Sequence, residues 1–169
     1  MSKVLIIERA DGGVSVTHPT PEKILRLGSA KAVLESEITR GRVPADAISY
    51  EIVEKDTLPA NRIFRDAWEK SGDQVTENMS KARIIHMDKI RVVRDTKLDE
   101  EDKNWNKAAD DTAKDVVEAR RVILRDLPNT SLEAAAIAAA NDTETLDAIW
   151  PTTELGVRVE AGVRVEAGA

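Results

Sequence analysis

One long segment without proline or glycine restricts the fold of this chain more than any other feature. The segment runs from Met79 to Lys107, and its apolar residues recur at helical intervals. Asn78, just before it, is a residue type that often caps helix N-termini. At about 1.5 Å per residue, the predicted helix is about 40 Å long. It is therefore longer than a small domain needs to cover its own core.

A second helix is predicted after a short polar link at residues 108–112, where Asp110 or Asp111 can act as the N-cap. Pro128 ends this helix, because proline cannot continue the backbone ladder. Its apolar positions are Val116, Val117, Ala119, Ile123, Leu124 and Leu127. Two amphipathic helices joined by so short a link predict an antiparallel helical hairpin over residues 78–128.

The charged residues of this predicted hairpin are unevenly distributed. Residues 79–98 carry six basic and two acidic side chains, whereas residues 99–111 carry six acidic and two basic ones. Two interpretations are open. The charges can form local pairs on a solvated surface, or the hairpin is a projecting arm whose two ends meet oppositely charged partners.

Residues 1–77 predict a small α+β unit that begins with a β-hairpin over residues 3–18. Its turn, Ala10-Asp11-Gly12-Gly13, contains residues that tolerate positive φ. Thr20-Pro21 is typical of a helix start. Gly28-Ser29 interrupts the helical pattern that follows, so one helix and two short helices are both open.

Strands are also expected later in this unit. Ile48, Tyr50 and Ile52 alternate with polar residues, as in a half-buried strand. A second turn is expected at residues 70–73, between two short apolar stretches.

The chain after Pro128 predicts short helices over residues 129–155. Thr130 or Ser131 can cap a helix that ends near Ala140, and Asp142 can cap another that ends near Ile149. The fold class is therefore α+β: a small N-terminal α+β unit, a long antiparallel helical hairpin, and short C-terminal helices.

A perfect repeat, Gly-Val-Arg-Val-Glu-Ala, occupies most of residues 156–169. Each copy is too short to fold alone, but its alternation places both valines on one face of an extended strand. The repeat either adds a strand to the sheet edge of a partner or hangs loose at the terminus.

The composition excludes several classes of function. The chain has no cysteine and only two histidines among 169 residues, so we expect no metal ligand set and no cofactor. A net charge of −6 disfavours a generally basic nucleic-acid binder. No apolar run reaches the roughly 20 residues of a spanning helix, and the N-terminus does not resemble a signal peptide. We expect no membrane partner.

Catalytic motifs are not found. There is no Gly-x-Ser-x-Gly nucleophile elbow, and Gly12-Gly13 lacks the Lys-Ser/Thr pair of a phosphate-binding loop. The acidic cluster at residues 99–102 lies in a highly charged helical segment, and a catalytic acid needs a sheltered cleft. We therefore expect no enzyme, no catalytic residue and no small-molecule substrate.

Large side chains on the predicted hairpin and after it are the candidate protein-interface residues. Trp105 and Trp150 are notable because aromatic residues are rare here, at 3%. Each either folds back on its own hairpin or anchors a partner. His86 shares a helical stripe with apolar residues and is expected to be a packed or partner-contacting histidine rather than a ligand or general base. The full candidate set is Trp105, Trp150, Pro151, Ile85, Ile90, Val93, Leu124 and Leu127.

An ordered set of short motifs resembles small proteins encoded in the tail region of tailed bacteriophages and prophages. The motifs are Phe64-Arg65-Asp66-Ala67-Trp68, Asn78 to Arg83, Ile85 to Arg91, Leu124-Arg125-Asp126-Leu127-Pro128 and Ile149-Trp150-Pro151. The last two are also similar to the C-terminal ends of tail assembly chaperones and tail fibre assembly proteins. The resemblance covers residues 48–151, and the repeat of the C-terminal tail departs from it.

The resemblance implies a role in protein–protein interaction without catalysis. The expected function is a structural or adaptor component of a phage tail that binds tail fibre or baseplate proteins, located in the virion tail and in the host cytoplasm during assembly. It could also associate with copies of itself. The alternatives are an assembly chaperone that is absent from the finished virion, and a nucleic-acid-linked regulator that uses the basic root of the hairpin.

Overall fold

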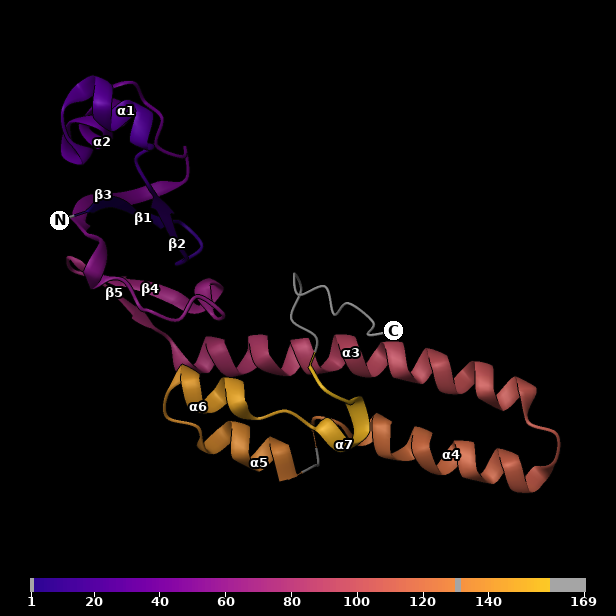
Figure 1. The fold of residues 1–169 in the computed structure, drawn as a ribbon. Coiled ribbons are helices and arrows are strands. Elements are labelled where there is room, and N and C mark those ends of the chain that lie inside the picture. Colours follow the sequence, from indigo (N-terminus) through magenta and orange to yellow (C-terminus); the bar gives the residue numbers. More distant parts are fainter. Residues whose placement is uncertain (1, 130–131, 159–169) are drawn as a thin grey trace, which may run out of the picture. The chain divides into compact units, whose positions relative to one another are not determined.

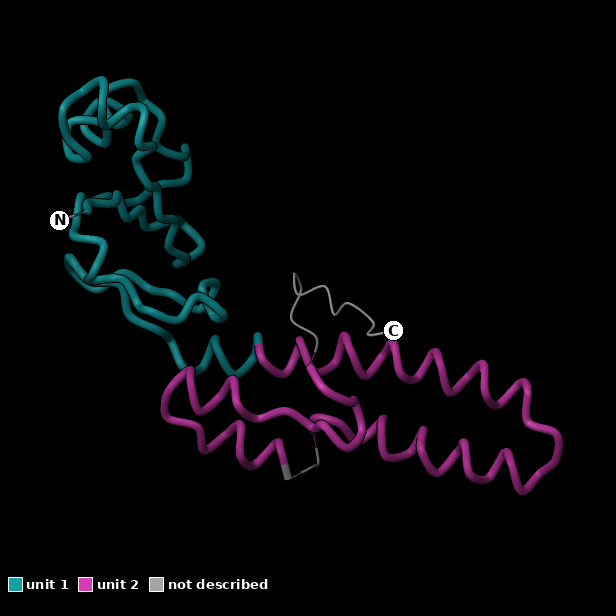
Figure 2. Tube along the Cα trace, viewed as in Figure 1, with its two compact units in different colours: residues 1–85 teal, residues 86–169 magenta. Residues whose placement is uncertain are grey.

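The computed structural model describes residues 2–129 and 132–158 (Figure 1). The chain forms two compact units, residues 1–85 and residues 86–169 (Figure 2). Among the described residues, the strands lie in the first unit and the second is helical, so the predicted α+β class is confirmed. The boundary between the units falls inside a helix, whereas the sequence places it between residues 77 and 78.

A three-stranded antiparallel sheet forms the centre of the first unit. Its strands are β1 (Lys3–Arg9), β2 (Val14–Thr17) and β3 (Ala47–Glu54), in the order β2–β1–β3. The predicted N-terminal β-hairpin is confirmed. Its turn depends on Gly12, whose φ of 74° is costly for residues with a side chain.

Two helices follow the β-hairpin, α1 (Pro21–Leu27) and α2 (Ala30–Thr39). Gly28 ends α1 in the left-handed conformation, with φ 84°. Ser29 then begins α2, because its side chain accepts a hydrogen bond from the Ala32 N–H at 3.1 Å. Of the two alternatives left open by the sequence, the structure has the pair of short helices.

The sheet of the first unit is covered on both faces. Leu5 and Ile7 of β1 pack with Leu34 of α2 on one face. Val4 and Ile6 pack on the other face with Trp68 from a second hairpin. This hairpin consists of β4 (Trp68–Ser71) and β5 (Gln74–Glu77), and two short 3-10 helices precede it: η1 (Lys55–Thr57) and η2 (Arg65–Ala67). Because helices and hairpin cover both faces, β1 is apolar at four successive positions rather than alternating.

The predicted strand is present as β3, but its apolar side chains are less buried than predicted. Ile48 is 65% exposed and Tyr50 is 49% exposed, and only Ile52 packs on the core. The reason is that β3 lies at the edge of the sheet. A register shift between Glu8 and Arg9 of β1 also interrupts its pairing at this end.

The helices of the second half are α3 (Met79–Lys107), α4 (Asp111–Asp126), α5 (Leu132–Ala139), α6 (Thr143–Ala148) and α7 (Thr152–Leu155). α3 begins in the first unit and continues into the second. α3 and α4 run antiparallel as the predicted hairpin (Figure 1). Asp110 caps α4, since its carboxylate accepts from the Ala113 N–H at 2.8 Å, and Asp142 caps α6 in the same way. α4 ends before a cis Leu127-Pro128 bond.

The core of the second unit joins the hairpin to the short helices. Its buried apolar residues are Ile90, Val117, Leu124, Leu127, Ile137, Ala140, Leu146 and Leu155. The predicted caps Thr130 and Ser131, and residues 159–169 of the C-terminal repeat, lie outside the described residues.

Candidate protein-binding site

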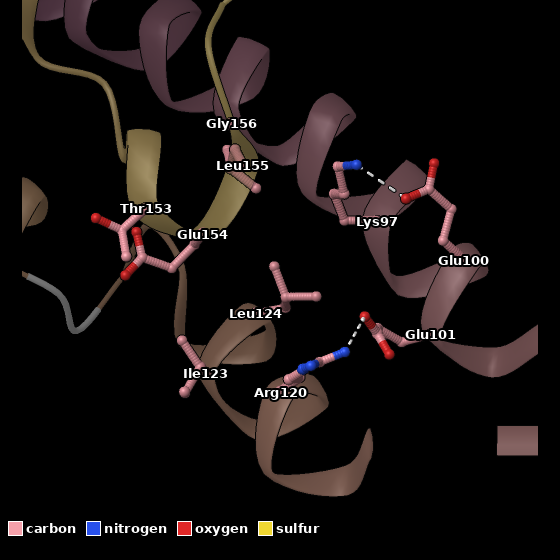
Figure 3. A pocket seen from close by; sticks show the side chains of 10 residues that line it. All are labelled: Lys97, Glu100, Glu101, Arg120, Ile123, Leu124, Thr153, Glu154, Leu155 and Gly156. Carbon is pink, nitrogen blue, oxygen red and sulfur yellow. Dashed lines mark hydrogen bonds and ion pairs between the residues drawn. The ribbon is translucent and has the colours of Figure 1, made fainter. Parts of the chain in front are cut away.

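A pocket of about 400 Å³ opens on the second unit between the hairpin and α7 (Figure 3). α3 forms one wall, α4 the facing wall, and α7 with the residue after it closes a third side. The lining residues are Lys97, Glu100, Glu101, Arg120, Ile123, Leu124, Thr153, Glu154, Leu155 and Gly156.

The segment from Trp150 to Gly156 places α7 beside the hairpin. The indole N–H of Trp150 donates to the Gly156 carbonyl at 3.0 Å, which closes the chain around this helix. Leu155 is only 4% exposed, so α7 is held by an apolar side chain in the core of the unit. Gly156 ends the helix with φ 79°. The Trp-Pro motif thereby builds one side of the pocket.

The pocket combines an apolar floor with charged walls. Leu124 and Leu155 point between the walls (Figure 3). On the walls, Lys97 Nζ lies 2.9 Å from Glu100 Oε2, and Arg120 Nη1 lies 3.8 Å from Glu101 Oε1. These pairs leave one carboxylate of the lining, on Glu154, with no ion pair among the described residues. The pocket therefore suits a basic side chain with an aliphatic stem.

An exposed apolar stripe on α4 leads to this pocket. Val116 is 52% exposed and Ile123 is 53% exposed, and the exposed Ala119 lies between them in sequence. Positions i, i+3 and i+7 fall on one side of a helix. Ile123 also lines the pocket, so the stripe and the pocket form one continuous surface. We call this surface the α4 face.

α4 therefore has apolar residues on two sides. Val117 and Leu124 point into the unit and are 7% and 6% exposed, whereas Val116 and Ile123 point outward. In the sequence these residues form one apolar set, within which the outward stripe is not distinguished from the buried side. The i, i+3, i+7 spacing was the available signal, but it does not show which side is buried.

The charges of the hairpin form many local pairs. Arg121 bonds Asp102 of α3 and Glu118 of its own helix, each at 2.9 Å. Arg125 bonds Glu118 at 2.7 Å, and this bond is the main reason that the pKa of Glu118 is lowered. Arg94 donates to the Leu127 carbonyl at 2.7 Å. These contacts correspond to the first of the two interpretations of the charge pattern, a solvated surface with local pairs.

Four of the predicted interface residues lie in the interior. Ile90, Leu124 and Leu127 are 0%, 6% and 3% exposed, and Pro151 is buried as well. For Ile90, Leu127 and Pro151 the predicted partner contact is corrected, because these side chains are buried against neighbours in their own chain. Leu124 is also buried, but it lines the pocket. Ile85, Val93, Trp105 and Trp150 are half-buried.

Both predicted tryptophan anchors pack against arginines of their own chain. Arg121 lies over the ring of Trp105, and Arg158 lies over the ring of Trp150, each 5.5 Å from the ring centroid. Arg158 also forms an ion pair with Asp147. Trp105 therefore packs on its own hairpin, whereas Trp150 packs on the segment that follows it, and cation–π attraction contributes to both contacts.

His86 is fully buried in the second unit, where its Nε2 lies 2.7 Å from the Ile149 carbonyl oxygen. Burial is the main cause that lowers its pKa, and the hydrogen bond to Ile149 partly opposes this. The prediction of a packed histidine is confirmed. The ring ties α3 to the segment that leads into the Trp-Pro motif.

No group of three or more potential ligand side chains that could hold a metal ion occurs in residues 2–129 and 132–158. Over the same residues, no helix combines the length and the apolar character required to cross a bilayer. No protein-family model, curated protein or solved structure matches the chain.

Proposed function

We propose that this chain is a non-enzymatic bacteriophage tail protein, a structural adaptor that binds tail fibre or baseplate proteins through the second unit. The α4 face, Val116, Ala119 and Ile123 together with the adjoining pocket, is the observation that carries the binding function. The phage tail itself is proposed from the ordered sequence motifs described above.

The α4 face has the properties of a small protein-docking surface. Exposed apolar side chains stand beside a concave site, where a partner side chain can be enclosed and desolvated. The helices that carry it are braced by the buried Ile90 and Leu124. A rigid surface loses little conformational entropy on binding, which favours affinity.

Charge sets the expected orientation of the partner. The walls of the pocket carry Glu154 without an ion pair, along with Glu100 and Glu101, which are already paired. A lysine or arginine of the partner is therefore expected to enter beside Glu154, with its aliphatic stem on Leu124 and Leu155. Such a contact contributes more to specificity and association rate than to affinity.

Mass spectrometry of purified phage particles tests the assignment to the tail. A structural adaptor is expected in stoichiometric amount with other tail proteins. Absence from the particles, combined with rescue of soluble fibre protein on co-expression, contradicts this proposal and supports the assembly chaperone.

Co-purification with the tail fibre and baseplate proteins of the same phage tests the surface. Ile123→Glu is expected to abolish co-purification, because it places a charge in the apolar stripe. Val92→Glu is the matched control, since Val92 is 67% exposed on α3 and does not line the pocket. Equal loss of binding in both variants, or in neither, would refute the α4 face as the docking surface.

Glu154→Lys separately tests the charged part of the pocket. It is expected to weaken co-purification and to slow association, whereas Glu144→Lys on the exposed surface of α6 leaves both unchanged.

A further inference from the structure

No strand within residues 2–129 and 132–158 covers one edge of the three-stranded sheet in the first unit. β3 pairs with β1 on one side only, and the β4–β5 hairpin packs on β1 and β2. The edge carries Ile48 and Tyr50, which are 65% and 49% exposed. An edge strand of eight residues with exposed apolar side chains is a template for another strand.

The backbone groups available on this edge follow from the pairing with β1. The Lys55 N–H donates to the Ser2 carbonyl at 2.7 Å, so the backbone of Lys55 faces β1. In an antiparallel pair, alternate residues direct their N–H and C=O groups to the same side. Tyr50 and Ile52 therefore direct theirs away from β1 and toward the free edge. The Glu54 carbonyl on the same side already accepts a hydrogen bond from Thr57 Oγ1 at 2.8 Å.

We propose that this edge pairs with β3 of a second copy of the chain, antiparallel, so that two three-stranded sheets join into one of six strands. The pairing places Tyr50 opposite Tyr50 of the second copy and Ile48 opposite Ile52. Ser49 then lies opposite Glu51. The exposed apolar side chains of both copies meet on one face, and no like charges oppose each other between Ala47 and Val53.

The apolar pattern of β3 favours this register for pairing with a second copy. In two neighbouring registers, the outward N–H and C=O groups of the two copies still lie opposite one another. One places Glu51 directly opposite Glu51 of the second copy, which is destabilising. The other places Ile52 opposite Asp46. The central register avoids both pairs and places the apolar residues from Ile48 to Ile52 opposite one another, with Glu54 opposite Asp46 only at its two ends. The Glu51 carboxylate also lies 4.0 Å from Lys70 Nζ of its own chain. A strand whose pattern complements itself in antiparallel pairing is typical of a two-fold symmetric interface.

Sedimentation of the full-length protein over a concentration series tests the dimer. The wild type is expected to dimerise, and Ile48→Lys is expected to raise the dissociation constant at least about tenfold, since a lysine on an edge strand opposes pairing. Leu25→Lys is the matched control, because Leu25 is 87% exposed on α1 in the same unit. Circular dichroism checks that both variants are folded. A monomeric wild type, or equal effects of the two variants, overturns the proposal.

Single cysteines test the register, because the chain contains no native cysteine. In a hydrogen-bonded antiparallel pair the Cα atoms are about 5.5 Å apart, which is within the range for a disulfide. Tyr50→Cys is therefore expected to cross-link rapidly to a covalent dimer under oxidation. Ser49→Cys is expected to react slowly, because its counterpart lies diagonally across the pair, at about 7–8 Å. Similar rates for the two variants contradict the register.

Amide hydrogen exchange separates a second copy from other occupants of the edge. The Tyr50 and Ile52 amides are expected to exchange slowly in the dimer and rapidly in monomeric Ile48→Lys. Slow exchange of these amides in a monomeric wild-type chain shows that a segment of the same chain covers the edge, and this overturns the proposal.

Discussion

The imidazole Nε2 of His86 lies 2.7 Å from the carbonyl oxygen of Ile149, which is 63 residues further along the chain. This contact joins α3 to the segment just before Trp150. The ring is fully buried. Because the acceptor is a carbonyl, the neutral ring donates its Nε2–H, and its hydrogen bond couples the hairpin to the segment that builds the pocket.

The buried ring predicts a loss of stability in mild acid. Burial, with Arg158 and Lys89 nearby, lowers the pKa of His86 from its ordinary 6.5, although the bond to Ile149 and the charge of Asp147 partly oppose this. A lowered pKa means that the unfolded chain binds the proton more tightly. The stabilising contribution is therefore complete above about pH 6.5 and falls as the pH drops toward the folded-state pKa.

His86→Gln is expected to reduce this pH dependence between about pH 7.5 and pH 5.5, because glutamine can donate to Ile149 but does not titrate. Denaturant unfolding at several pH values measures it. His18, whose pKa is also lowered by burial and by Arg62 and Lys55, contributes a slope of the same sign. His18→Gln is thus the comparison variant, and an unchanged slope in His86→Gln would contradict the assignment.

Two positions on α3 are expected to differ sharply in their effect on stability. Ile90 is 0% exposed and Val92 is 67% exposed. Ile90→Ala is expected to reduce the free energy of unfolding by about 2–5 kcal/mol, because it leaves a cavity in the core of the second unit. Val92→Ala is expected to change it by less than about 0.5 kcal/mol. Chemical denaturation monitored by circular dichroism measures both.

The tip of the hairpin depends on one capping carboxylate. Asp110 accepts from the Ala113 N–H at 2.8 Å, whereas the side chain of the neighbouring Asp111 is 99% exposed. Asp110→Ala is expected to destabilise the protein by about 1 kcal/mol. Asp111→Ala is expected to destabilise it by only about 0.3 kcal/mol, through loss of the interaction with the helix dipole. Comparable losses in thermal unfolding would show that general negative charge, rather than the cap, stabilises α4.

The pKa of Glu118 is expected to rise in Arg125→Ala. The hydrogen bond from Arg125 is the largest of the causes that lower this pKa, and the charge and hydrogen bond of Arg121 lower it further. Carboxyl carbon chemical shifts, followed by NMR during a pH titration, report this pKa directly. Arg120→Ala is the control, because Arg120 pairs with Glu101 instead. A Glu118 pKa that moves equally in both variants would indicate long-range charge rather than the specific bond.

Local sequence signals predicted most of the secondary structure. The absence of proline and glycine from Met79 to Lys107 matches α3, and Asp110 and Asp142 cap helices as their positions predict. The choice between one and two helices near Gly28 required the structure, because both backbone conformations are open to glycine.

Local sequence signals could not show which apolar residues are exposed and able to bind a partner. Ile90, Leu124 and Leu127 read as interface residues in the sequence, yet they form the core of the second unit. Helical spacing identifies an apolar side but does not say whether the partner is another helix of the same chain. That depends on α5, α6 and α7, which are short and carry weak signals of their own.

The sequence by itself determined the main helices and strands and several of their ends, because caps, turns and hydrophobic period act over a few residues. Only the tertiary structure decided which side of α4 is exposed, that α7 completes a pocket beside Glu154, and that β3 keeps a free edge at Tyr50. Each of these depends on which distant segments cover a surface, and burial is a property of the packed chain rather than of its residues one by one.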